Sequence, residues 1–146
     1  MPIDGVKITP LKIIETKGGN VLHAMKNSDN GYMGFGEAYF SVVESKAIKG
    51  WKRHKNMVLN LVVPVGSVRF VLLDDREYQD NTNYFYEVIL NNSNSYSRLT
   101  IPPMIWVGFQ GISSQSSILL NIANIEHSPD EVERKDLEEL KFNWSK

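Results

Sequence analysis

Short runs of apolar or alternating residues follow one another from the N-terminus to about Asn124. Val, Ile, Phe and Tyr are enriched in these runs and turn residues separate them, a pattern typical of β-strands. The expected strands cover residues 8–14, 36–43, 57–63, 68–73, 84–90, 99–101, 105–110 and 118–123. Residues 17–20 and 64–67 carry the glycines and the proline of two expected turns.

The strand expected over 36–43 alternates in character along its length. Period-two alternation places Glu37, Tyr39 and Ser41 on one face. Ala38, Phe40 and Val42 then share the other face. The run 68–73 is instead apolar on both faces, which predicts a strand buried on both sides, as when a partner subunit covers a barrel wall. Many short strands at regular spacing predict a sandwich or a barrel.

The C-terminal segment has a different residue pattern, which is typical of the start of a helix. Ser128 is a candidate N-cap, Pro129 suits the first helical position, and Glu131 completes a capping box. Acidic residues lead and Lys135 follows, as the helix dipole prefers. The sequence therefore predicts a short helix over about 129–140.

Composition narrows the class of protein. The chain has 146 residues, 42% of them hydrophobic, a formal net charge of −1 and no cysteine. We expect one domain spanning 1–146. A near-neutral charge argues against a nucleic-acid partner, and no segment is long and apolar enough for a membrane span. The N-terminus lacks the pattern of a secretory signal, so we expect a cytoplasmic location.

The sequence lacks the residue patterns of a metal site and of a serine nucleophile. The three histidines, His23, His54 and His127, lack the one-residue spacing of a metal-binding β-barrel, so neither a metal nor another cofactor is expected. No serine lies in a Gly-x-Ser-x-Gly elbow. The missing cysteines also exclude thiolate metal sites and cysteine nucleophiles.

The densest polar cluster spans residues 49–55. On a strand, Lys52 and His54 point to the same face as Gly50, whereas Trp51, Arg53 and Lys55 point to the other. A basic site for an anionic ligand and a solvated strand end both fit this pattern. Trp106 also leaves two interpretations, a ring that stacks on a base or sugar and a core tryptophan.

In combination, these landmarks resemble the dTDP-4-dehydrorhamnose 3,5-epimerase family of cupin-like jelly rolls. The resemblance rests on five segments in the family's order: Gly36-Glu37-Ala38-Tyr39-Phe40-Ser41, Lys49-Gly50-Trp51-Lys52, the hairpin from Val65 to Asp74-Asp75-Arg76, Ile101-Pro102-Pro103 with Gly108-Phe109, and Ser128-Pro129-Asp130-Glu131. It implies an all-β, cupin-like double-stranded β-helix. It also implies a homodimer, in which barrels pack and exchange strands.

The resemblance further implies a reaction. Family enzymes act on a nucleotide-linked 4-keto-6-deoxyhexose: a histidine held by a carboxylate removes a proton beside the ketone, and a tyrosine is the acid on the other face. Cationic residues hold the diphosphate and the enolate. In this chain Lys52 falls at the catalytic histidine's position, Asn121 near that of the tyrosine, Tyr39 at that of an active-site asparagine, and Lys49 at that of an arginine.

Two functions follow from this pattern. The first is a divergent sugar-nucleotide epimerase or isomerase for surface polysaccharides, with Lys52 as base or as the group that polarises the ketone and His54 as its proton partner. Its substrate-binding residues are expected to be Tyr39, Lys49, Trp106 and Asn121. The second is a protein that binds a nucleotide sugar, or supports a partner enzyme, without turnover.

Overall fold

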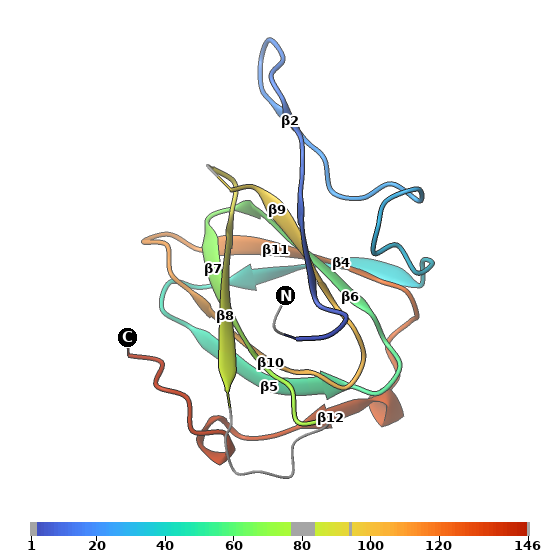
Figure 1. Cartoon of the computed structure of the whole chain (residues 1–146). Helices are drawn as coiled ribbons and strands as arrows, with labels where there is room; N and C mark the ends of the chain where they lie inside the picture. The colour runs from blue at the N-terminus through green and yellow to red at the C-terminus, as the bar shows by residue number, and fades with distance from the viewer. Residues whose placement is uncertain (1–2, 77–83, 94, 146) are drawn as a thin grey trace.

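The computed structural model describes residues 3–76, 84–93 and 95–145, and its regular secondary structure consists of β-strands and two short 3-10 turns (Figure 1). Its first strands are β1 (Lys7–Pro10), β2 (Ile13–Ile14), β3 (Val21–Leu22), β4 (Glu37–Val43), β5 (Ile48–His54) and β6 (Leu59–Val65). The others are β7 (Ser67–Leu73), β8 (Phe85–Asn91), β9 (Ser97–Ile101), β10 (Trp106–Gly111), β11 (Ser117–Ala123) and β12 (Val132–Arg134).

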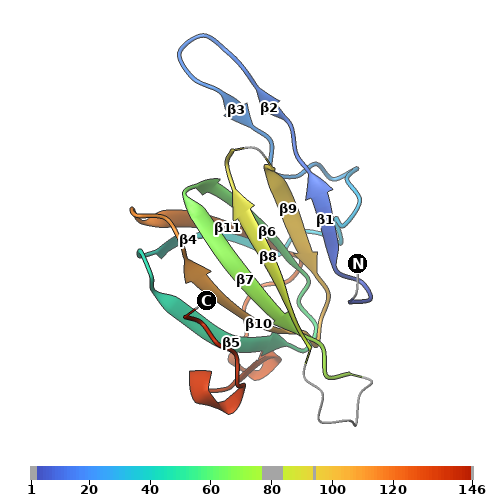
Figure 2. The ribbon, with the colours of Figure 1, turned by 60° about the vertical axis from the view of Figure 1, so that its left-hand side comes forward.

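The strands form two antiparallel sheets that face each other. One sheet has the order β1-β9-β6-β11-β4 and the other the order β12-β5-β10-β7-β8. Inward side chains from both sheets, among them Leu61, Phe70 and Leu99, form the main apolar core. This arrangement confirms the expected all-β, cupin-like jelly roll. The short hairpin of β2 and β3 contains the turn expected at 17–20 and projects away from the barrel (Figure 2).

β4 and β11 lie side by side with strict alternation. Asn121 pairs with Tyr39 and Leu119 with Ser41, and these four side chains face the barrel interior. The outward residues are all apolar: Ala38, Phe40 and Val42 on β4 and Ile118, Leu120 and Ile122 on β11. The outer surface of this half of the sheet therefore presents apolar side chains to solvent.

The C-terminal segment is not the helix expected over 129–140. It consists of a 3-10 turn (Pro129–Glu131), the strand β12 and a second 3-10 turn (Leu137–Glu139). The Ser128 side chain makes no capping hydrogen bond in the described structure, since the Glu131 backbone N–H donates to the Ser128 carbonyl at 3.1 Å instead. The Glu131 carboxylate accepts the Asn56 N–H. The capping box of this segment is formed by Asp136 and Glu139 instead.

The free edge of β5 explains this difference. An unpaired strand edge leaves backbone donors and acceptors unsatisfied, whereas a helix of about 12 residues is only marginally stable alone. The C-terminal segment satisfies that edge, with Trp51 N–H donating to Lys135 O at 2.9 Å and Lys135 N–H returning to Trp51 O at 3.1 Å. Ladder bonds with β5 therefore outweigh the local helix signals.

The C-terminal segment also explains why β7 is buried on both faces. The alternate residues Val71 and Leu73 face outward, yet both are buried. They pack in a second apolar cluster with Trp51 and Trp106 and with the tail residues Leu137, Leu140, Phe142 and Trp144. Gly108 makes room for this packing, because a Cβ there would approach the rings of Trp51 and Trp144 within 2.9 and 3.0 Å. This face is covered by the chain's own tail, not by the partner subunit that the sequence suggested.

Candidate functional site

A pocket with a volume of about 170 Å³ opens between the two sheets. Tyr39 and Ser41 of β4, Leu59 and Leu61 of β6, and Leu119 and Asn121 of β11 form one wall. The facing wall is formed by β5, β10 and β12, and His127 lies in the connection between the walls. The described lining residues include Lys49, Lys52 and Arg134 but no carboxylate, so the pocket is suited to an anionic ligand.

Strand β5 supplies three polar side chains to this pocket. Lys52 and His54 point inward, whereas Trp51 and Arg53 point to the outer face, as alternation predicts. Strict alternation would separate Lys49 from Lys52. The register shifts between them, since Val107 pairs with Lys52 and Phe109 with Lys49, so three steps on β5 match two on β10. This bulge brings both lysines to the pocket.

His54 is held by a buried carboxylate. Its Nδ1 lies 2.6 Å from Glu131 Oε1, and Glu131 is only 6% exposed. The second carboxylate oxygen accepts the backbone N–H groups of Asn56 and Met57 at 2.9 and 3.0 Å. With Nδ1 engaged by Glu131, Nε2 is the ring nitrogen left for a ligand.

The charge states of this wall follow from its contacts. Burial alone would raise the pKa of Glu131, but the hydrogen bonds from Asn56, His54 and Met57 outweigh it and hold that pKa below its usual range. The carboxylate is therefore ionised beside His54. Partial burial, and then the positive charges of Arg134 and Lys49, lower the pKa of Lys52. Lys52 still lies at the solvent-accessible mouth of the pocket.

The facing wall carries a second polar pair. Tyr39 and Asn121 are direct partners in the β4–β11 ladder. Asn121 Nδ2 donates to Tyr39 Oη at 2.9 Å, and its Oδ1 is buried with no hydrogen-bond partner among the described residues. The structure thus brings five expected site residues to one pocket: Tyr39, Lys49, Lys52, His54 and Asn121.

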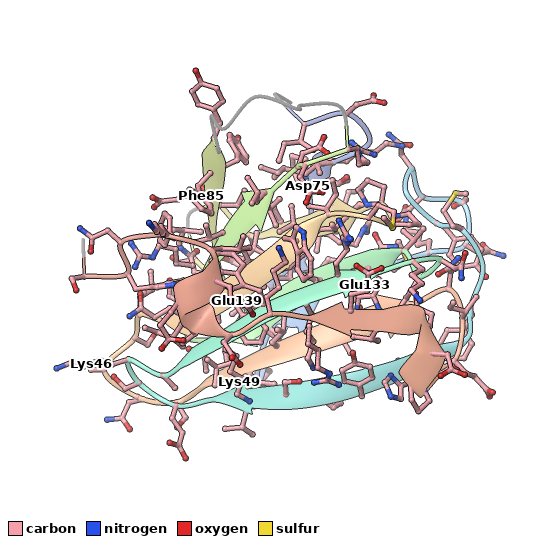
Figure 3. All side chains as sticks on the ribbon, turned by 90° about the horizontal axis from the view of Figure 1, so that it is seen from below. Lys46, Lys49, Asp75, Phe85, Glu133 and Glu139 are labelled. Carbon is pink, nitrogen blue, oxygen red and sulfur yellow. The ribbon has the colours of Figure 1, made fainter. Side chains whose placement is uncertain are left out.

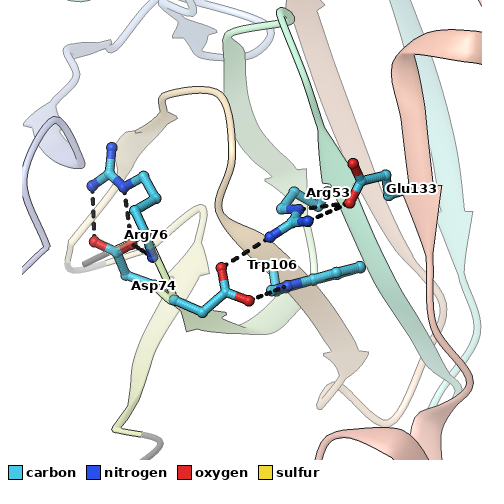
Figure 4. Close-up of polar contacts among 6 residues, drawn as sticks. Arg53, Asp74, Arg76, Trp106 and Glu133 are labelled. Carbon is cyan, nitrogen blue, oxygen red and sulfur yellow. Dashed lines mark hydrogen bonds and ion pairs between the residues drawn. The ribbon is translucent and has the colours of Figure 1, made fainter. Parts of the chain in front are cut away.

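Trp106, the sixth expected site residue, is not in this pocket. Val107 and Phe109 take the inward positions of β10, so Trp106 faces outward and is buried on the opposite side of the strand. Its Nε1 donates to Asp75 Oδ2 at 3.1 Å, and the Arg53 guanidinium lies 4.5 Å from its ring centroid (Figure 4). The interpretation of Trp106 as a stacking platform for the ligand is therefore wrong.

Arg53 joins this outer cluster to β12. It is paired with Glu133 and with Asp75, the latter at 2.9 Å (Figure 4). Figure 3 shows Glu133 and Lys49 on opposite sides of the C-terminal segment. Because residues alternate along β12, Glu133 contacts the outer cluster while Arg134 enters the pocket. We call Arg53, Asp75, Trp106 and Glu133 the outer clasp.

Sequence reasoning missed Glu131, Arg134 and His127. Glu131 carried a helix-capping signal, and no local pattern connects it to His54, which lies 77 positions earlier. Arg134 lies in the segment that the sequence predicts as a helix, and helical periodicity does not place it on the face of β12 that lines the pocket. Across the described part of the chain, no three His, Cys, Asp or Glu side chains gather as a metal site.

Comparisons with known proteins agree with this fold. The family model described as "FdtA: WxcM-like, C-terminal" matches residues 4–141. The chain is 34% identical to a dTDP sugar isomerase from Desulfovibrio desulfuricans G20, with a TM-score of 0.91 over 99% of this chain and 93% of that one. It is also 24% identical to the spore coat polysaccharide biosynthesis protein SpsL of Bacillus subtilis, over 98% of this chain and 97% of SpsL.

A third likeness concerns the fold alone. A histidine-to-asparagine variant of the 3,4-ketoisomerase QdtA from Thermoanaerobacterium thermosaccharolyticum, solved with TDP-4-keto-6-deoxyglucose, has a TM-score of 0.74 at 20% identity, over 91% of this chain and 89% of QdtA. These matches confirm the resemblance to sugar-nucleotide epimerases and isomerases. The chain belongs to the FdtA, WxcM-like family. Among the described residues, no helix is long and apolar enough to cross a membrane.

Proposed function

We propose that this protein isomerises or epimerises a nucleotide-linked 4-keto-6-deoxyhexose during polysaccharide synthesis. The observation that carries the proposal is the His54–Glu131 pair, which lies 2.6 Å apart at a pocket rich in cations. The isomerase from D. desulfuricans and SpsL support the reaction class and the process by their names. The sugar bound to the QdtA variant supports the substrate class.

His54 is the general base in this mechanism. A ketone acidifies the neighbouring C–H bond, so a neutral imidazole within reach removes the proton. Glu131 fixes the ring through Nδ1 and stabilises the imidazolium that forms, because its own carboxylate is ionised. The sequence suggested Lys52 as base or as the polarising group, and the pairing of His54 with Glu131 favours the second role for Lys52.

The cations stabilise the charges of the bound sugar nucleotide. Lys52 neutralises the enolate oxygen that develops at the ketone. Lys49 and Arg134 line the same pocket and attract the diphosphate. In each role, a positive side chain at the pocket lies opposite a negative group of the bound ligand.

Deuterium exchange tests the proposal directly. A panel of nucleotide-linked 4-keto-6-deoxyhexoses is incubated with the protein in D₂O and followed by NMR. We expect exchange beside the ketone, with a loss of about 100-fold or more in His54→Gln and in Lys52→Ala, as is typical when a general base or a charge-stabilising group is removed. Binding by calorimetry without exchange across the panel would instead identify a protein that binds nucleotide sugars without turnover.

We also propose that the protein is a homodimer that packs through the outer surface of β4 and β11. Phe40 and Val42 are 70% and 59% exposed there, and Leu120 and Ile122 lie beside them. An exposed apolar surface of this size is typical of an interface, and a two-fold axis would pack it against the same surface of a second copy. The cytoplasmic location expected from the sequence stays a prediction, which cell fractionation tests.

A further inference from the structure

Asn121 carries a buried acceptor that no described residue satisfies. Its side chain lines the pocket from β11 and is 3% exposed. Nδ2 donates to Tyr39 Oη at 2.9 Å, which fixes the orientation of the amide group. Oδ1 is buried and receives no hydrogen bond from the part of the chain that the structure describes. A buried acceptor without a partner is unfavourable, so this atom is suited to a donor that arrives with a ligand.

The surroundings of Asn121 explain why its Oδ1 stays unpaired. The neighbours on the same face of the sheet are Leu119 and Ala123 along β11 and Leu61 across the ladder on β6. These side chains are apolar and cannot donate. Tyr39 is the directly opposite residue on β4, and its oxygen already accepts from Nδ2. A donor for Oδ1 must therefore come from inside the pocket.

The charge of the pocket selects the kind of donor. Lys49, Lys52 and Arg134 line it, and its described lining residues include no carboxylate. These cations repel an ammonium group on a ligand but not a neutral hydroxyl group. A 4-keto-6-deoxyhexose carries such hydroxyl groups on the ring carbons C2 and C3. An amide does not titrate, so Asn121 can bind one of them without exchanging a proton.

We propose that Asn121 is a specificity-determining residue that accepts a hydrogen bond from a ring hydroxyl group, at C2 or C3, of the bound sugar; this rests on the proposed function. The hydroxyl group donates to Oδ1 while Nδ2 stays on Tyr39, so the acceptor is oriented before the ligand arrives. A site built to bind a substrate hydroxyl rejects the analogue that lacks it, because the buried acceptor is then left unpaired. The protein therefore discriminates against a sugar that is deoxygenated at the carbon facing Asn121.

Calorimetry with three ligands tests this role: a nucleotide-linked 4-keto-6-deoxyhexose and its 2-deoxy and 3-deoxy analogues. Every protein carries His54→Gln to suppress turnover. We expect one analogue to bind about 10- to 100-fold more weakly than the parent sugar, the range for a buried acceptor left unpaired. Adding Asn121→Leu should reduce this preference to about threefold or less, because the acceptor is gone. The same analogue should bind the Leu variant at least as tightly as it binds the protein with Asn121.

Two further variants separate hydrogen bonding from a structural effect. Asn121→Asp keeps an oxygen acceptor in the pocket, and its second oxygen can accept the Tyr39 O–H, so we expect the hydroxyl preference to remain. Ser41→Ala removes a polar group from the same wall, at the diagonal position of the β4–β11 ladder, and should also keep the preference. Without ligand, Asn121→Leu should unfold within about 5 °C of wild type, since an apolar side chain of similar size replaces an incompletely paired amide.

Three results would overturn this role of Asn121. They are equal binding of all three ligands to the protein with Asn121, a hydroxyl preference that persists in Asn121→Leu, and a uniform loss of affinity for all three ligands in that variant. Deuterium exchange in the wild type tests the proposed function separately. A hydroxyl preference that Asn121→Leu abolishes, in a protein whose wild type exchanges no deuterium, would support the role of Asn121 and contradict turnover.

Discussion

Glu131 shows how one buried carboxylate organises the pocket wall that carries His54. It contacts the His54 ring and two backbone N–H groups, those of Asn56 and Met57, so it joins β5, the loop after it and the C-terminal segment. The sequence predicted Lys52 and His54 on one strand face from alternation alone. It assigned Glu131 to a helix cap, because a contact between residues so distant along the chain leaves no local signature. Trp106 was misplaced for a related reason, since a strand pattern does not say which face is the pocket.

Glu131→Gln tests the contribution of this residue to catalysis. The amide oxygen can still accept the N–H groups of Asn56 and Met57, but the NH₂ group then faces His54 Nδ1 as a donor. The variant therefore loses both the acceptor that orients the ring and the charge that stabilises the His54 imidazolium. We expect the exchange rate beside the ketone to fall about 10- to 100-fold, as for loss of an orienting partner of a functional histidine. Substrate affinity, measured by calorimetry, stays within a few-fold. An unchanged exchange rate would contradict the role of Glu131.

The same variant gives a pH prediction for stability. Because the pKa of folded Glu131 lies below its ordinary value of 4.5, its ionised form stabilises the fold. This contribution is fully present above pH 4.5 and is lost as the pH falls through the folded-state pKa. The unfolding free energy of wild type should therefore exceed that of Glu131→Gln above pH 4.5, and the difference should shrink on further acidification. Urea unfolding at several pH values measures it, and a difference independent of pH would contradict the shift.

At the scale of elements, β12 is the decisive unit. It was predicted as part of a helix, because Ser128, Pro129 and the acidic residues after them are a genuine helix-start pattern. The open edge of β5 reverses this preference, and no local pattern reports that an edge is available. The strand then presents Glu133 to the outer clasp and Arg134 to the pocket. The alternation of one short strand thus connects the outer surface to the site.

Glu133→Gln tests this connection between the outer clasp and the pocket. The substitution weakens the pairing with Arg53, so β12 is held less firmly against β5. We expect a stability loss of about 1 kcal/mol, the scale of a partly exposed ion pair, and a decrease of several-fold in exchange rate. Asp74→Asn is the matched control, because Asp74 pairs with Arg76 at 2.8 Å away from β12. Thermal unfolding should show similar losses for the two variants, and equal exchange rates in both would contradict the connection.

At the scale of the whole molecule, the jelly roll has one outer surface that its own tail covers and one that is exposed. The tail covers the surface of β5, β10 and β7, whereas β4 and β11 expose apolar side chains. The sequence predicted the barrel and most strand positions, because period-two alternation and turn residues are local signals. It could not predict that the chain covers one surface itself. A strand with apolar residues on both faces has the same sequence pattern whether its own tail or a partner subunit buries the outer face.

Phe40→Asp tests the proposed dimer. A charge at this position in a packed apolar interface would be buried without a partner, so we expect the variant to be a monomer by light scattering at micromolar concentration. Ile89→Asp is the control, because Ile89 is also exposed, at 52%, but lies on β8 in the other sheet. A monomeric wild type, or a Phe40→Asp dimer, would contradict the interface.

The most direct test of the whole account is a structure of the His54→Gln variant with a nucleotide-linked 4-keto-6-deoxyhexose. The account predicts that the sugar lies between the walls of β5 and of β4 and β11, with the ketone oxygen beside Lys52. The carbon next to the ketone should lie about 3–3.5 Å from the side chain at position 54, the distance of a reactive approach. A ligand bound outside this pocket, or a sugar ring that points away from both walls, would contradict it.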